Sequence, residues 1–180
     1  MERTRQLMGE VLVYCFVVVL LTGGFLTFFY TPSNEVVAYN GFYEPLRGTP
    51  MSAAYNSILT IDSEVRGGPF VRRLHHSSSI VLVLGTVVWA LLGRFRYALA
   101  ALGLGVLGVL SGYGSADDLF FRTFLGKLPT PWWYGLHLLL ALAVGAVLVI
   151  SSRREAVRNP RTLPFVALSL GLTILAVFGL

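Results

Sequence analysis

Five apolar stretches, each close to the length of a membrane-spanning helix, constrain this chain more than any other feature. They cover about residues 8–30, 74–93, 97–113, 132–150 and 163–180, and charges, prolines or turn residues bound each one. A helix that crosses the hydrocarbon core of a bilayer needs about 20 residues at a rise of about 1.5 Å per residue. We therefore predict an all-α integral membrane protein that has no room for a large soluble catalytic domain.

The composition agrees with this prediction, because 55% of the residues are hydrophobic and only 13% are charged, against roughly 25% charged in soluble domains. The first apolar stretch is longer than the core of a signal peptide and no small-residue cleavage pattern follows it, so we expect it to stay in the mature chain. Cys15 is the single cysteine. An intrachain disulfide and a covalent c-type haem motif are thus excluded, and we interpret Cys15 as a buried small hydrophobe.

Basic residues are concentrated on one side of the predicted membrane. The N-terminus and the two links on its side carry eight arginines against three glutamates, a net of +5, whereas the charges of the opposite side sum to zero. The positive-inside rule then predicts a multi-pass plasma-membrane protein with a cytoplasmic N-terminus and an external C-terminus. We interpret the net charge as orientation in a lipid bilayer and not as affinity for nucleic acid.

The predicted external connection over residues 31–73 is rich in glycine, proline, tyrosine and charge, and is too polar to span a membrane. Connections between helices in compact proteins are usually a few residues long. The length of this loop therefore indicates contact with an external partner.

Histidines occur at the external ends of two predicted spans. His75 and His76 begin the second span, and His137 lies about five residues into the fourth. Both spans run from outside to inside, so His75 and His137 fall at a similar depth, where a ligating residue is by default functional. Two imidazoles on facing helices can take both axial positions of a b-type haem. The alternative is that they are interfacial histidines satisfied by water or backbone, and spacing alone does not separate the two.

Two glycines lie at the same predicted depth as these histidines, Gly23 in the first span and Gly112 in the third. A helical glycine permits the close approach of a flat ligand or of another backbone. Plain helix packing is the alternative, since glycine is common in membrane helices.

Several longer motifs carry a family resemblance: TGGFLTFFYTPS (22–33), AYNGFYEPLRG (38–48), MSAAYNSILTIDSEVRGGPFVRRLHH (51–76), SGYGSADDL (111–119) and WYGLH (133–137). With them, residues 9–154 resemble the N-terminal haem-binding half of cytochrome b from respiratory cytochrome bc complexes, most closely the actinobacterial form. The resemblance implies a cytochrome b-type four-helix bundle over residues 1–154. An internal link and a fifth transmembrane helix would follow over residues 155–180.

In that family four histidines hold two stacked haems, with two ligands about fourteen residues apart on each of two helices. Fourteen residues are about 3.9 helical turns, or roughly 21 Å, so both ligands lie on one helix face. His75 and His137 match the external pair. The internal positions hold Trp89 and Ser151 or Ser152 instead, which are not usual ligands of haem iron.

The family's paired glycines lead to the same expectation. Gly9 and Gly23 match the pair of the first helix, and Ala98 and Gly112 match that of the third. The replaced position, Ala98, belongs to the internal haem. We therefore expect a haem at the external level and none at the internal level, where Trp89 helps to fill the vacated volume.

We expect one non-covalent haem b with His75 and His137 as axial iron ligands. His75 and not His76 keeps the family's register, and it places Arg72 three residues earlier, where the resemblance implies a contact with a haem propionate. Arg73 is the neighbouring candidate. A topological or surface-charge role is the alternative for either arginine.

Parts of the family's quinol site have no counterpart in this sequence. The motif that follows the fifth helix in the family is not found, because the sequence stops within the fifth apolar stretch. Without ligands for an internal haem, a conventional Q-cycle is not expected through this chain alone. Residues 115–128 are expected to supply one or two amphipathic helical turns. Asp117 and Asp118 match the actinobacterial pattern there, although such a pair also serves as a helix cap.

These observations favour a single-haem b electron-transfer subunit of a respiratory quinol-linked complex, itself non-catalytic. Its expected partners are other subunits of that complex, with an external cytochrome, an iron–sulfur protein or menaquinone at a shared site as candidate electron partners. A haem-free structural or anchor subunit is the alternative from another class. A third alternative is a quinone-binding catalytic subunit whose site a partner chain completes.

Overall fold

The computed structural model of the chain describes residues 2–93, 96–116 and 128–179. These residues form six α-helices, a short 3-10 helix and one two-stranded sheet. The elements are α1 (Glu2–Thr27), β1 (Val36–Ala38), η1 (Glu44–Leu46), β2 (Pro50–Ser52), α2 (Ala53–Ser63), α3 (Gly68–Leu91), α4 (Arg96–Ser115), α6 (Thr130–Arg158) and α7 (Leu163–Phe178). The predicted helical membrane architecture is confirmed.

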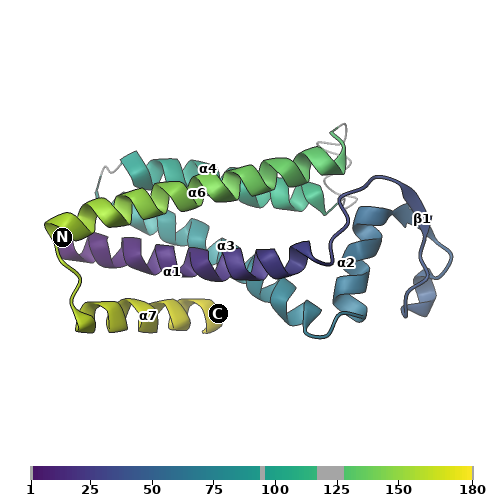
Figure 1. Ribbon diagram of the computed structural model, residues 1–180, viewed down its shortest axis with the longest axis horizontal. Helices are drawn as coiled ribbons and strands as arrows, with labels where there is room; N and C mark the ends of the chain where they lie inside the picture. Colours follow the sequence, from purple (N-terminus) through teal and green to yellow (C-terminus); the bar gives the residue numbers. More distant parts are fainter. Residues whose placement is uncertain (1, 94–95, 117–127, 180) are drawn as a thin grey trace.

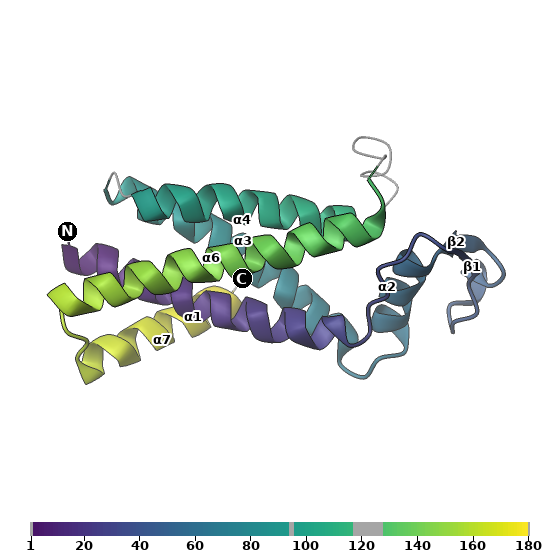
Figure 2. The same ribbon diagram turned by 45° about the horizontal axis from the view of Figure 1, so that its top comes forward.

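Four long helices form a bundle. Helix α1 packs on α3, α4 packs on α6, and contacts of α3 with α4 and of α1 with α6 close the ring, so that α3 and α6 stand at opposite corners. Helix α7 lies along α1 on the side away from α4 (Figures 1 and 2). The four bundle helices are long and apolar enough to cross a membrane, whereas α7 is apolar but has 16 residues, about 24 Å at 1.5 Å per residue.

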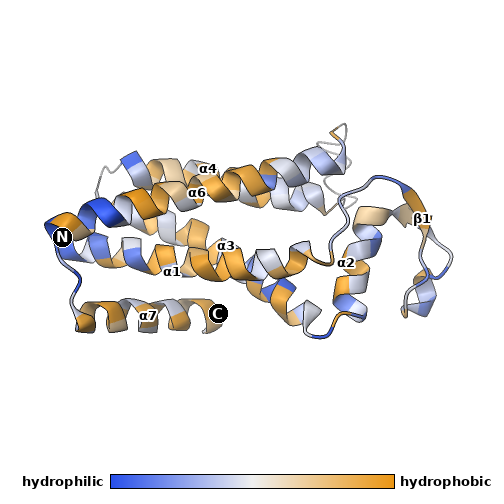
Figure 3. Ribbon diagram, viewed as in Figure 1, coloured by the Kyte–Doolittle hydropathy of each residue, from blue (hydrophilic) through white to orange (hydrophobic). Residues whose placement is uncertain are grey.

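The helices of the bundle are apolar along their middle (Figure 3), and many of their apolar side chains are exposed. Large side chains face outward on different helices, among them Leu21, Leu91 and Leu142, which are 69%, 82% and 68% exposed. Hydrophilic residues gather at the two ends, in the first turns of α1, the last turns of α6 and the bend between α2 and α3. This distribution fits a bundle whose sides face lipid and whose ends face water.

The hydrophobic core lies in the half of the bundle that is farther from the hairpin, which we call the inner half. Its buried members come from all four bundle helices and from α7: Leu12, Cys15, Leu82, Trp89, Ala98, Ala101, Val144, Leu148 and Val177. Cys15 is a free thiol, 1% exposed, and its Sγ lies 3.4 Å from the carbonyl oxygen of Ser78. The interpretation of Cys15 as a buried small hydrophobe is confirmed.

Helix α6 continues to Arg158, eight residues past the predicted end of the fourth span. The added turns are amphipathic and are fixed to α1, since Arg5 donates to Glu155 at 2.9 Å and Gln6 donates to the carbonyl of Asn159 at 2.7 Å. Hydropathy alone ended the span at Ile150, because it does not register that Glu155 is paired with Arg5 of α1.

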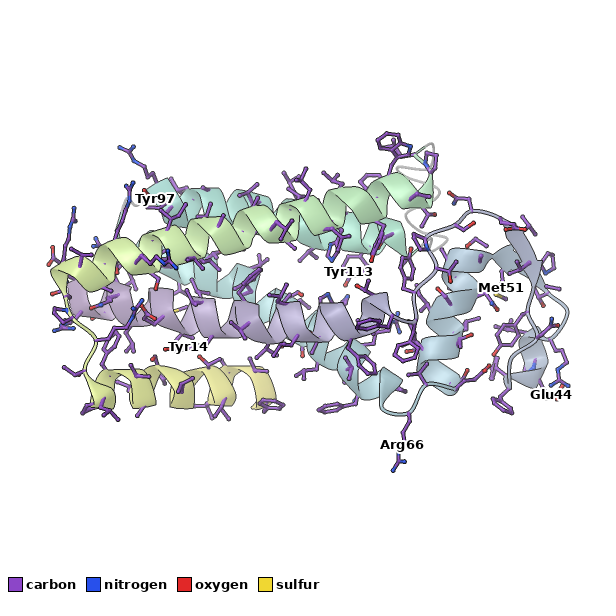
Figure 4. The ribbon with its side chains drawn as sticks, in the orientation of Figure 1. Tyr14, Glu44, Met51, Arg66, Tyr97 and Tyr113 are labelled. Atoms are coloured by element: carbon purple, nitrogen blue, oxygen red, sulfur yellow. The ribbon has the colours of Figure 1, made fainter. Side chains whose placement is uncertain are left out.

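The predicted external loop folds into a hairpin and a helix beyond one end of the bundle (Figure 1). Strands β1 and β2 pair antiparallel, with Val37 opposite Met51. Ser52 caps α2 by accepting a hydrogen bond from the Tyr55 N–H at 3.2 Å. The chain then turns into α3 at Gly67, whose φ of +79° is a conformation that glycine adopts at little cost. Figure 4 shows Glu44 and Met51 in this unit, with Arg66 pointing away at the bend before α3.

Candidate haem site between the histidine helices

The structure brings His75 and His137 together near the hairpin end of the bundle. His75 lies in the second turn of α3 and His137 in the second turn of α6, and both are half-buried. Their ring centroids are 6.2 Å apart and their planes are inclined by 71°. Two residues that are 62 positions apart in the sequence thus face one small volume from opposite corners of the bundle.

The tautomer of His137 follows from its hydrogen bond. Its Nδ1 lies 2.8 Å from the carbonyl oxygen of Gly108 in α4. A carbonyl oxygen only accepts, so Nδ1 carries a proton, and in the neutral imidazole Nε2 then keeps its lone pair. This is the arrangement that metal-ligating histidines use, with the far nitrogen donating to a carbonyl.

His75 is held in the same way by α1. Its Nδ1 lies 3.1 Å from the carbonyl of Val19 and 3.1 Å from the hydroxyl oxygen of Thr22. The Thr22 hydroxyl lies 2.7 Å from the Val18 carbonyl, to which it donates, so it accepts from His75. Both histidines therefore present an unprotonated Nε2.

The spacing of the rings fits two axial ligands of one metal ion. A metal–imidazole bond is about 2 Å and the ring centre lies about 1 Å beyond the nitrogen, which puts the centroids about 6 Å apart. The observed 6.2 Å agrees. Among the described residues no group of three or more His, Cys, Asp or Glu is placed to hold a metal ion. A haem needs only two ligands from the protein, because the porphyrin supplies four of the six iron ligands itself.

Gly23 and Gly112 lie directly against the two imidazoles. A Cβ at Gly23 would be 3.0 Å from Cε1 of His75, and one at Gly112 would be 3.0 Å from Cε1 of His137. Each glycine thus lets α1 or α4 approach a ring closely. The sequence placed both glycines at this level, and the structure adds that their immediate neighbours are the rings.

A valine at position 112 should therefore disrupt the site. Gly112→Val would push the His137 ring away from Gly108, and we expect at least a tenfold loss of bound haem per chain, measured from the reduced absorption spectrum of the purified protein. Gly103→Val is the matched control, since a Cβ at Gly103 on the same helix meets nothing within 4 Å. Equal haem content in the two variants would contradict this assignment.

The predicted arginines lie at the same end of α3. Arg72 is half-exposed and donates to Asp62 of α2 at 2.6 Å, whereas Arg73 is exposed. The contact of either with a propionate stays a prediction. The ring of His76 packs edge-on against the ring of Tyr113 in α4, with the two centroids 4.9 Å apart.

The hydrogen-bond partners that orient the two rings could not be predicted from the sequence. Val19 and Gly108 act through backbone carbonyls, which no residue type signals, and the Thr22 hydroxyl carries no signal beyond the motif in which it lies. Asp117, Asp118 and most of the predicted helical turns over residues 115–128 lie outside the described residues.

Two positions that hold internal haem ligands in the family are occupied here by Trp89 and Ser152. Trp89 is 1% exposed, and a Cβ on Gly9 would lie 3.4 Å from its Cζ2. Ser152 donates to Oε1 of Glu10 at 2.9 Å and accepts from Arg161 at 2.6 Å. An aromatic side chain and a serine bonded to the Glu10–Arg161 ion pair thus stand where the family has imidazoles.

Fold and site together define a helical membrane protein with a paired-imidazole site of the kind that binds b-type haem. No family model matches the chain. It is 37% identical over 174 residues to the cytochrome bc1 complex cytochrome b subunit of Mycobacterium tuberculosis, covering 74% of this chain and 32% of that protein. The subunit of Corynebacterium efficiens is 35% identical over 155 residues, covering 79% and 27%, and that of Streptomyces coelicolor 37% over 129 residues, covering 65% and 24%.

The N-terminal part of the chain is similar to actinobacterial cytochrome b, which confirms the resemblance that its motifs predict. It spans about a third or less of the length of these curated relatives. The sequence similarity together with the four apolar helices makes it a multi-pass membrane protein.

Proposed function

We propose that this chain is a single-haem b electron-transfer subunit of a respiratory quinol-linked membrane complex, with the haem near the external face. The observation that carries the proposal is the pair of imidazoles of His75 and His137, 6.2 Å apart and each with Nδ1 engaged. Both Nε2 atoms are left to hold the iron, as a bis-histidine haem site requires.

The inner level supports a count of one haem. Trp89 packs against Gly9 inside the hydrophobic core, and Ser152 is engaged with Glu10 and Arg161. A second porphyrin there would need two ligands, and it would have to displace a buried aromatic ring and a buried ion pair.

The chain's own residues would hold and orient the cofactor. His75 and His137 would hold the iron through their Nε2 atoms, and Gly23 and Gly112 let the neighbouring helices approach the rings closely. Bound haem supplies reversible one-electron transfer. Arg72 and Arg73 are placed at the external end of α3, where a guanidinium can pair with a propionate.

The membrane orientation and partners belong to the same proposal. The surplus of arginine at the end of the bundle with the N-terminus supports a cytoplasmic location for that end and an external location for the hairpin. Residues 1–154 would form the cytochrome b-like part and residues 155–180 the link and fifth helix, with a C-terminus outside. The relatives named above are subunits of cytochrome bc1 complexes, so other subunits of such a complex, an external cytochrome or iron–sulfur protein, and menaquinone at a shared site are the partners that we propose.

The haem content of the purified protein tests the proposal. We expect about one haem b per chain by pyridine haemochrome assay, with a dithionite-reduced α band of the b type, because the chain offers one pair of axial imidazoles. A ratio of two would overturn it. A colourless chain that still co-purifies with a respiratory complex would instead establish the structural or anchor alternative. A shift of the haem spectrum by inhibitors of the external quinol site would favour the quinone-binding alternative.

A further inference from the structure

We infer that the extramembrane unit between α1 and α3 is a brace that fixes the two histidine helices relative to each other, with Asn34 as its positioning residue. This inference rests on the proposed haem site. Helices α3 and α6 carry the two imidazoles but stand at opposite corners of the bundle. A continuous series of hydrogen bonds and close contacts through the external unit joins the beginnings of these two helices.

The first link joins the loop after α1 to the first residue of α6. Asn34 Oδ1 accepts the Thr130 N–H at 2.7 Å, and Asn34 Nδ2 donates to the Thr130 hydroxyl at 2.6 Å. The N-cap residue Pro129 has no side-chain cap of its own, and Thr130 is 2% exposed. An amide from 96 residues away thus caps α6, two turns before His137.

The second link joins the same loop to α2. The carbonyls on either side of Asn34 accept hydrogen bonds from the first two residues of α2: Ser33 from the Ala54 N–H at 3.0 Å and Glu35 from the Ala53 N–H at 2.8 Å. Asn34 is therefore held between two backbone anchors. The backbone of Asn34 is thus tied to the start of α2, and its side chain to the start of α6.

The third link joins α2 to α3. Asp62 near the end of α2 accepts from Arg72 at 2.6 Å, one turn before His75. The helices also touch at the bend, since a Cβ at Gly68 would lie 2.0 Å from the carbonyl oxygen of Ile61. The series from Thr130 to Arg72 thus ends one turn from the second imidazole. A unit built in this way sets the distance between the imidazoles of His75 and His137 and their rotation relative to each other.

Removing the Asn34 amide tests the brace. In Asn34→Ala we expect haem transfer to apomyoglobin to become about tenfold faster, as for second-shell changes at ligand sites, and the low-spin electron paramagnetic resonance signal to shift and broaden. The chain should still fold, because the core lies in the inner half and Tyr30 still bonds to the Ser115 carbonyl on the outer side. Asp62→Ala should act in the same direction from the other end of the brace.

Two further variants separate positioning from a general effect on the loop. Asn40→Ala removes an exposed amide from the same unit and should match the wild type. Asn34→Asp should restore the wild-type signal, since its carboxylate accepts from both the Thr130 N–H and the Thr130 hydroxyl. Wild-type behaviour of Asn34→Ala, or equal effects of Asn34→Ala and Asn40→Ala, would overturn the inference.

A distance measurement keeps the brace distinct from the haem proposal. Spin labels at Ile80→Cys on α3 and Leu139→Cys on α6, both exposed, report the separation of the two helices with or without cofactor. We expect the distance distribution to widen in Asn34→Ala. A haem-free wild type with this widening would refute the haem proposal alone, whereas an unchanged distribution would refute the brace.

Discussion

Replacing His137 with alanine should abolish haem binding, with the ratio of haem to chain falling from about one to near zero. The loss is this large because the chain offers one partner imidazole across from His75, and a single remaining ligand holds b-type haem weakly in a site built for two. The dithionite-reduced spectrum of the purified chain measures it. His75→Ala should give the same result.

His76→Ala is the matched control for these two variants. His76 is adjacent to His75 in sequence but is exposed and packs on Tyr113. Its removal should leave the haem content unchanged. An intact b-type spectrum in His137→Ala, or its loss in His76→Ala, would show that the ligand assignment is wrong.

Arg161→Ala should lower the free energy of unfolding by about 3 kcal/mol, because it leaves the buried carboxylate of Glu10 without its counterion. The Glu10 side chain is 4% exposed and lies 2.8 Å from Nη2 of Arg161. Ser152 still donates to that carboxylate, which places the effect at the lower end for a broken buried pair. Thermal unfolding in detergent, followed by circular dichroism, measures the change.

Two comparisons decide whether the pair causes this loss. Arg158→Ala removes an exposed arginine that forms no ion pair within the part of the chain described here, and it should change stability by no more than about 0.5 kcal/mol. Glu10→Ala with Arg161→Ala should recover part of the loss, since no buried charge is left unpaired. A double variant as unstable as the sum of the two single variants would contradict the assigned coupling.

The positions of the site residues could be predicted from the sequence, but their hydrogen bonds could not. The alternation of apolar and charged segments put His75, His137, Gly23 and Gly112 at one depth, and the structure brings each histidine into contact with one of these glycines. The hydrogen bonds that orient the rings could not be predicted. They use the carbonyls of Val19 and Gly108, and every residue has a carbonyl, so only the packing of α1 on α3 and of α4 on α6 selects these two.

The internal contacts of the external unit could not be predicted from the sequence. Composition predicted a non-spanning segment over residues 31–73, whereas α3 begins at Gly68 and includes the last six residues of that range. The sequence explained the length of this segment by contact with a partner. Three-residue strands have too little periodicity to be recognised, and the contacts of Asn34 with Thr130 join positions 96 residues apart. An internal role for this unit therefore emerged only from its folded contacts.

The sequence by itself determined the helical membrane class, the levels of the histidines and glycines, and the resemblance to cytochrome b, because hydrophobic length, charge and motif spacing are properties of the linear chain. The tertiary structure decided which nitrogen of each imidazole is free, what surrounds Trp89 and Ser152, and how α6 is anchored to the external unit. These are contacts between segments distant in the chain, and they exist only when the helices have packed.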